Sequence, residues 1–178
     1  LDAEAEKEYR ETKLLKTLDI MESKMVNDLV LGNMPEEVLY YLDLKNISTE
    51  CGGNCFCIRI QSSLDKCGRQ KLYQAVRKEF DYLDLTIMFS ETNHMVTAVV
   101  FCREPDVLPG IFRKMEEFLA SILRQQQIAF MMGSGTPFVD VSQIEESYEK
   151  ARERVGDMVA QTESGEEGTE HDRDMPRE

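Results

Sequence analysis

Four short β-rich runs interrupt a series of amphipathic helical stretches from residue 56 onward, and this alternation restricts the fold more than any other feature of the chain. The run "FCIRIQ", residues 56–61, places Phe56, Ile58 and Ile60 on one face and polar or smaller side chains on the other. Such alternation is typical of a strand with one buried face.

The other three predicted strands follow from composition and spacing. Residues 84–90 and 95–102 are β-rich and are separated by the short turn "ETN", which indicates an antiparallel hairpin. Residues 128–132, "IAFMM", form the fourth predicted strand. Helices are predicted on either side of these strands, with apolar residues at helical spacing, over residues 2–31, 35–42, 65–81, 109–126 and 142–156.

The resulting order of strand, helix, strand, strand, helix, strand and helix predicts an α+β fold of the ferredoxin-like βαββαβ kind. We expect an antiparallel sheet with its helices packed on one face, in agreement with the one-sided pattern of residues 56–61. The expected division is an N-terminal helix over 1–33, the α+β domain over 34–157, and an acidic, disordered tail over 158–178.

Charge and cysteine content exclude several classes of function. A net charge of −13 disfavours direct contact with nucleic acid or with an anionic membrane. No apolar run reaches the roughly 20 residues of a membrane span. Five cysteines without regular spacing indicate reduced thiols in a cytoplasmic protein. The group "CGGNCFC", residues 51–57, has too few ligands for zinc, and we interpret it as a turn that enters a strand with a half-buried thiol.

The stretch "GSGTPFVDVSQIEESYEKARE", residues 133–153, is the most motif-like segment, and it allows three interpretations. A phosphate-binding loop is disfavoured because no basic residue lies between Gly133 and Glu149. A nucleophilic Ser147 would need a base, and the two histidines of the chain are poorly placed to act as one. We therefore favour an architectural role. In this interpretation Gly133 and Gly135 break the strand, and Tyr148 packs on the sheet beside Ile144 and Ala151.

The order of these elements resembles the GGDEF-like middle domain of AraC-type bacterial transcription regulators of the YesN kind, and of related sugar-diacid and purine-catabolism regulators. The resemblance covers roughly residues 10–155. It is carried by the segment "KMVNDLVLGNMPEEVLYYLDLKN" and by a glycine-x-glycine turn followed by Ser-Tyr-x-x-Ala. The matching motif residues are Gly133, Gly135, Ser147, Tyr148 and Ala151.

The resemblance implies a domain related to diguanylate cyclases that has lost their chemistry. The hairpin reads "SETNHMVT", residues 90–97, where a cyclase has its acidic motif, and residues 60–63 read "IQSS" where a cyclase has a metal-binding acid. Two-metal phosphoryl transfer requires carboxylate ligands. We therefore expect no catalytic residue, metal or cofactor. The alternatives are a residual cyclase and a module that binds a nucleotide or another small molecule.

The N-terminal helix is where we expect the function of this chain to lie. Leu14, Leu18, Met21 and Met25 recur at the spacing of a coiled-coil seam. The resemblance implies an upstream receiver or membrane sensor domain and a downstream helix-turn-helix domain, joined in a dimer. We expect a weak homodimer through residues 10–30 that relays an upstream rearrangement. The alternative is that the apolar stripe folds back on its own domain.

Overall fold

The computed structural model describes residues 2–61, 64–92 and 95–174, and the side chains in these ranges except those of residues 12, 14–19 and 163–174. It is an α+β fold around one four-stranded antiparallel sheet in the order β2-β3-β1-β4. The strands are β1 (Gly52–Ile60), β2 (Leu85–Thr92), β3 (Met95–Cys102) and β4 (Phe130–Ser134). The antiparallel α+β architecture and the β2–β3 hairpin predicted from the sequence are confirmed.

The predicted helices are present, with ends that differ by a few residues except at the C-terminus. They are α1 (Asp2–Val30), α2 (Glu36–Leu44), α3 (Lys66–Glu79), α4 (Leu108–Gln125) and α5 (Ile144–Asp174). Local chemistry explains several boundaries. Gly32 has a φ of 77° just after α1, where a left-handed residue ends a helix. Asp65 caps α3 by accepting a hydrogen bond from the Gly68 amide at 2.7 Å.

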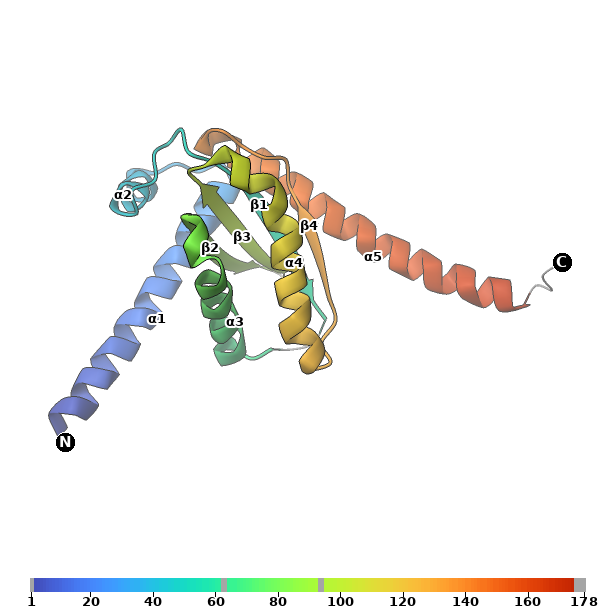
Figure 1. Ribbon diagram of the computed structural model, residues 1–178, viewed down its shortest axis with the longest axis horizontal. Coiled ribbons are helices and arrows are strands. Elements are labelled where there is room, and N and C mark those ends of the chain that lie inside the picture. Colours follow the sequence, from blue (N-terminus) through green and yellow to red (C-terminus); the bar gives the residue numbers. More distant parts are fainter. Residues whose placement is uncertain (1, 62–63, 93–94, 175–178) are drawn as a thin grey trace.

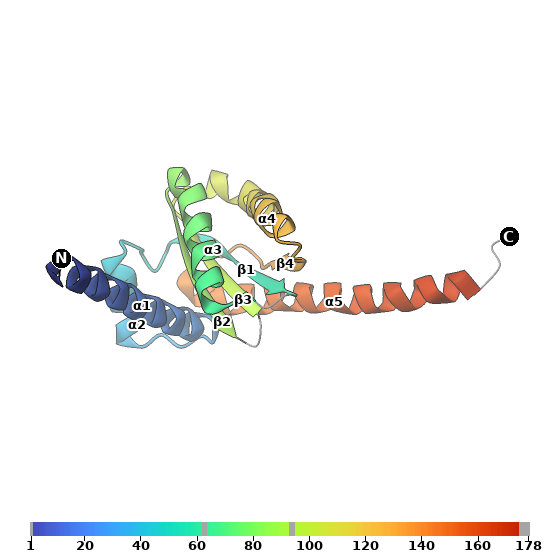
Figure 2. The same cartoon turned by 90° about the horizontal axis from the view of Figure 1, so that it is seen from below.

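Helices cover both faces of the sheet, so the expectation of helices on one face is wrong. Figure 2 shows α3 and α4 on one side of the strands and α1, α2 and α5 on the other. The first face buries Phe56 and Ile58 of β1 with Met115 of α4, and the second buries Cys55 and Phe101 among residues of α1, α2 and α5.

Strand β1 shows why the one-sided interpretation failed. It begins at Gly52, ahead of the alternating run, and residues 53–58 are buried without interruption. Cys57, which we expected to be half-buried, is 0% exposed. Small residues and cysteines are not counted as hydrophobic when a sequence is checked for alternation. Cysteine is nevertheless among the most frequently buried residues. A central strand between two helical layers is therefore easily mistaken for a one-sided strand.

The C-terminal segment also corrects an expectation. We predicted disorder from residue 158, whereas α5 continues as a helix to Asp174. Figure 1 shows α5 leaving the body of the molecule well before its end. Its first turns are fixed on the sheet, and adding residues to an existing helix needs no new nucleus. Pro176, which would interrupt a helix, lies two residues beyond the end of α5.

Candidate functional site

The glycine-x-glycine motif lies in and beside strand β4, where helix α5 crosses the sheet. Gly133 is within β4 and pairs with Cys57 of β1, so the expectation that it breaks the strand is wrong. Gly135 is one residue beyond β4, and its amide still donates to the Cys55 carbonyl at 2.7 Å. The chain therefore continues beside β1 through both glycines.

Both glycines are required because the backbone of α5 approaches the sheet closely. A Cβ atom on Gly133 would lie 2.8 Å from the Ala151 carbonyl oxygen, and one on Gly135 would overlap the Ser147 carbonyl oxygen. Real Cβ atoms are not found at such distances from a backbone oxygen. The two glycines and the two small helical residues, Ser147 and Ala151, together form a tight joint between α5 and β4. We call these four residues the α5–β4 joint.

Ser147 also completes the hydrogen bonding of the sheet. It is 0% exposed, and its Oγ accepts a hydrogen bond from the Cys55 amide at 3.1 Å. The same hydroxyl donates to Asn54 Oδ1 at 3.1 Å, and Asn54 Oδ1 also accepts from the Cys55 amide at 2.7 Å. A buried backbone N–H without a partner is costly. The Ser147 hydroxyl therefore supports β1.

Tyr148 packs between the sheet and solvent. Its ring contacts the cluster that contains Ala151 and Cys57, and it also contacts the larger cluster that contains Ile144. The Arg152 guanidinium lies 5.8 Å from the ring centroid. Tyr148 is only partly buried, and this partial burial raises the pKa of its hydroxyl. The expected packing beside Ile144 and Ala151 is therefore present, but the ring is not fully enclosed.

The cysteines near this joint are buried thiols. Cys55 and Cys57 are each 0% exposed, and desolvation raises the pKa of each to about 12. A protonated thiol is a poor nucleophile and a poor metal ligand. Within the described ranges, no group of three or more histidine, cysteine or acidic side chains is arranged to hold a metal ion.

The end of the β2–β3 hairpin is the place where a cyclase would have its acidic motif. Residues 93–94 lie outside the described residues, but Glu91 is described at the end of β2. The Glu91 carboxylate accepts a hydrogen bond from the Tyr73 hydroxyl and forms an ion pair with Arg69 at 2.8 Å. Burial and the neighbouring Glu91 carboxylate raise the pKa of Tyr73. This acid is therefore occupied by contacts within the protein.

The residues of the predicted seam on α1 have different environments in the structure. Met25 is 6% exposed and packs in its own domain, which removes it from the expected dimer surface. Met21 is 42% exposed. The side chains of Leu14 and Leu18 lie outside those that the structure describes. The alternative of a fold-back is thus correct for the C-terminal end of the helix, where Val26, Leu29 and Val30 are also buried.

A polar contact that the sequence did not indicate fixes α1 to the edge of the sheet. Glu22 of α1 forms an ion pair with Arg77 of α3, and it also accepts a hydrogen bond from the Phe89 amide at 3.4 Å. Arg77 Nε donates to the Ile87 carbonyl at 3.2 Å. We call Glu22 and Arg77 the β2 clasp. Its members are 55 positions apart in the sequence, so no local pattern could have revealed it.

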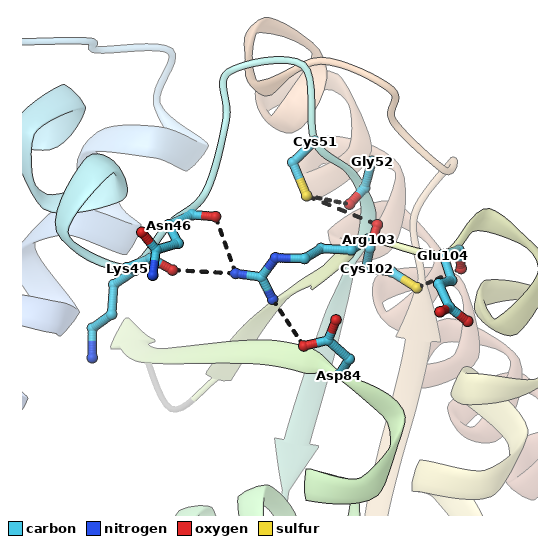
Figure 3. Close-up of polar contacts among 8 residues, drawn as sticks. All are labelled: Lys45, Asn46, Cys51, Gly52, Asp84, Cys102, Arg103 and Glu104. Atoms are coloured by element: carbon cyan, nitrogen blue, oxygen red, sulfur yellow. Dashed lines mark hydrogen bonds and ion pairs between the residues drawn. The ribbon is translucent and has the colours of Figure 1, made fainter.

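Arg103 forms a second long-range junction, next to the start of β2, and Figure 3 shows its contacts. Its guanidinium donates to the carbonyl oxygens of Lys45 and Asn46 at 3.2 and 3.1 Å, and it pairs with Asp84 at 3.3 Å. The two carbonyls lie just after α2, where a helix leaves its last acceptors unsatisfied. Arg103 therefore joins the end of α2 to the sheet.

No model of a known protein family matches the sequence, and no curated protein is detectably similar to it. Among the residues that the structure describes, no helix is both long and apolar enough to cross a membrane.

Proposed function

We propose that this chain is a non-catalytic relay domain of a cytoplasmic, AraC-type bacterial transcription regulator, which couples an upstream input to a DNA-binding domain outside this chain. One observation carries the proposal. The helices α1 and α5 are both fixed to the same face of one sheet, and both extend beyond it in different directions (Figure 1). A shift of α1 that moved the sheet would therefore also move α5. Such shifts of packed elements are a recognised kind of switching transition.

The order of the elements and of the strands in the sheet also supports this assignment. The elements β1, α3, β2, β3, α4 and β4 follow one another in βαββαβ order, and the sheet order β2-β3-β1-β4 is antiparallel throughout. We infer a ferredoxin-like core of the degenerate GGDEF-like kind, extended by α1 and α2 before it and by α5 after it. The second face of the sheet, which a simple ferredoxin-like core leaves open, is the face that the two terminal helices occupy.

The absence of catalysis is supported by the engagement of Glu91 with Arg69 and Tyr73. A metal-binding carboxylate would have to give up both partners. Incubation with GTP and magnesium tests this directly, and we expect no cyclic dinucleotide. Product formed by the purified chain would overturn the non-catalytic assignment in favour of a residual cyclase.

A thermal-shift screen tests the other alternative, a module that binds a nucleotide or another small molecule. Nucleotides and metabolites should leave the melting temperature unchanged. A bound ligand at 100 times its dissociation constant would add about 2.7 kcal/mol to the free energy of unfolding.

We further propose that two copies pair weakly through the part of α1 that precedes the β2 clasp, roughly residues 10–21. Met21 is the member of the predicted apolar seam that is described and exposed in this part of α1, at 42% exposure. Met21→Arg should weaken self-association in sedimentation experiments without unfolding the domain. Lys24→Glu, at an exposed position on the same helix, is the control. A test by deletion must spare residues 22–30, because this segment includes four core residues.

A further inference from the structure

Three large apolar side chains are exposed along one side of α1. Tyr9, Ile20 and Leu31 are 68%, 63% and 62% exposed. They are eleven residues apart in the sequence, and eleven residues make close to three helical turns, so the three lie in line along the helix. Leu31 keeps its helical position just after the end of α1, because its amide donates to the Asn27 carbonyl at 3.2 Å. We call Tyr9, Ile20 and Leu31 the outer stripe of α1.

The outer stripe faces away from the domain. Successive residues of an α-helix are about 100° apart, so Leu29, nine positions after Ile20, lies on the opposite side of the helix. Leu29 is 1% exposed and packs in the core. The same rotation separates Ile20 from its neighbour Met21, so the outer stripe is a different face of α1 from the predicted seam. An apolar stripe on a helix is normally buried, and this one has no partner within its own domain that covers it.

The spacing of the outer stripe makes it self-complementary. Ile20 lies midway between Tyr9 and Leu31, so a second α1 placed antiparallel and centred on Ile20 brings Tyr9 opposite Leu31 twice and Ile20 opposite itself. A two-fold interface requires a surface that complements itself in this way. The matched segment, residues 9–31, is about 33 Å long at 1.5 Å per residue. Its N-terminal part extends beyond the sheet, where a second helix has room to lie along it (Figure 1).

The charges near the outer stripe favour the antiparallel orientation. The positions of Lys13, Lys16 and Lys24 follow the same side of α1, and a parallel pair would place each of them opposite itself. In the antiparallel pair, position 13 comes opposite Asn27, and position 16 comes opposite Lys24. Like charges that face each other lower affinity. Glu37 of α2 forms an ion pair with Lys24 at 3.8 Å, so it offsets the positive charge at the second of these positions.

We propose that the outer stripe is an interaction surface for a second copy of this chain, which binds through its own outer stripe in the antiparallel orientation with the two-fold axis at Ile20. Tyr9 of each copy packs against Leu31 of the other. This contact does not depend on the proposed relay function. It also uses a different face of α1 from the contact that includes Met21, so the two contacts can be tested separately.

Substitution at the two-fold axis tests the contact in solution. Ile20→Arg places two like charges face to face, and it should lower the association constant in sedimentation experiments about tenfold or more. Because Ile20 is mostly exposed, this variant should fold as the wild type does. Tyr82→Arg is the matched control, since Tyr82 is 72% exposed and belongs to the short 3₁₀ turn between α3 and β2. It should leave association unchanged.

Site-specific crosslinking tests the orientation, in a Cys67→Ser background that removes the exposed thiol. Tyr9→Cys mixed with Leu31→Cys should form a disulfide-linked heterodimer under mild oxidation, whereas Tyr9→Cys alone should form no dimer. A parallel pair would give the reverse result.

Three outcomes would overturn the proposal: a chain that remains monomeric up to about 100 μM, an Ile20→Arg variant that associates as the wild type does, or a Tyr9→Cys variant that crosslinks with itself. Association that is lost in Met21→Arg and kept in Ile20→Arg would support the predicted seam instead. If both variants dissociate, the crosslinking result decides between the two faces of α1.

Discussion

Individual residues of the α5–β4 joint are constrained by distance. Gly133 and Gly135 face backbone carbonyls of α5, whereas Gly156, further along the same helix, has no heavy atom within 4 Å of the position a Cβ would take. Only glycine fits at Gly133 and Gly135. At Gly156 nothing requires a glycine, and its presence lowers the stability of the helix. This contrast gives a direct test of the joint.

Gly135→Ala should destabilise the fold by about 2–4 kcal/mol, because the added Cβ would overlap the Ser147 carbonyl and α5 would have to move away from β1. Gly156→Ala should stabilise it by about 0.5–1 kcal/mol, since alanine is the better helix former. Urea unfolding of both variants measures the difference. Equal stabilities would mean that α5 does not approach the sheet in this way.

Ser147→Ala should cost about 1–2 kcal/mol, because the Cys55 amide would keep only its contact with Asn54. The same urea titration measures this loss. A variant as stable as the wild type would show that the hydroxyl does not support β1.

Tyr148→Ala should destabilise by about 1–3 kcal/mol, which is less than truncation of a fully buried aromatic ring, because part of the ring is in contact with solvent. Tyr148→Phe keeps the ring and should be close to neutral in the same unfolding measurement. A large loss in the phenylalanine variant would indicate a role for the hydroxyl instead.

At the scale of elements, α1 consists of two segments with different surroundings. From Glu22 onward it is held by the β2 clasp and by core residues such as Val26 and Leu29, while its first turns extend beyond the sheet (Figure 1). The clasp lies at the junction of the two segments. In the proposed relay function, the clasp is the point at which a movement of the projecting segment would be passed to the domain.

Glu22→Gln should loosen α1 locally. The charge-assisted contact with Arg77 would be replaced by a neutral one, at a cost of about 1–2 kcal/mol. Hydrogen exchange should accelerate in α1 around the clasp and leave β1 and β3 protected. Glu37→Gln is a suitable control, because Glu37 forms only an exposed pair with Lys24 at 3.8 Å. Unchanged exchange in α1 would contradict the role of the clasp.

For the whole molecule, the buried thiols make stability depend on pH in the alkaline range. The pKa values of Cys55 and Cys57 rise from about 9 in the unfolded chain to about 12 in the fold. Their contribution to stability is complete below pH 9 and is lost as the pH increases toward 12, by up to about 1.4 kcal/mol per pH unit for each thiol. Urea unfolding at pH 8 and pH 10 should therefore show a smaller loss of stability in Cys57→Ala than in the wild type. An identical loss in both proteins would place Cys57 in contact with solvent.

The sequence by itself determined the order of the elements, because the periods of strands and helices are local properties of neighbouring residues. Alternation and turn residues indicated the β2–β3 hairpin, and Gly32 and Pro35 marked the end of α1 and the start of α2. The sequence also indicated that the segment from Gly133 to Ala151 is architectural, since no basic residue lies between Gly133 and Glu149 and the segment contains no histidine that could act as a base.

Only the tertiary structure decided what these elements cover. The second helical layer, the β2 clasp and the contacts of Arg103 join residues far apart in the chain, and local periodicity contains no information about such pairs. The role of the two glycines was reversed for the same reason. A glycine that relieves a clash with a distant helix and a glycine that ends a strand look alike in the sequence, because the difference lies in what packs against them.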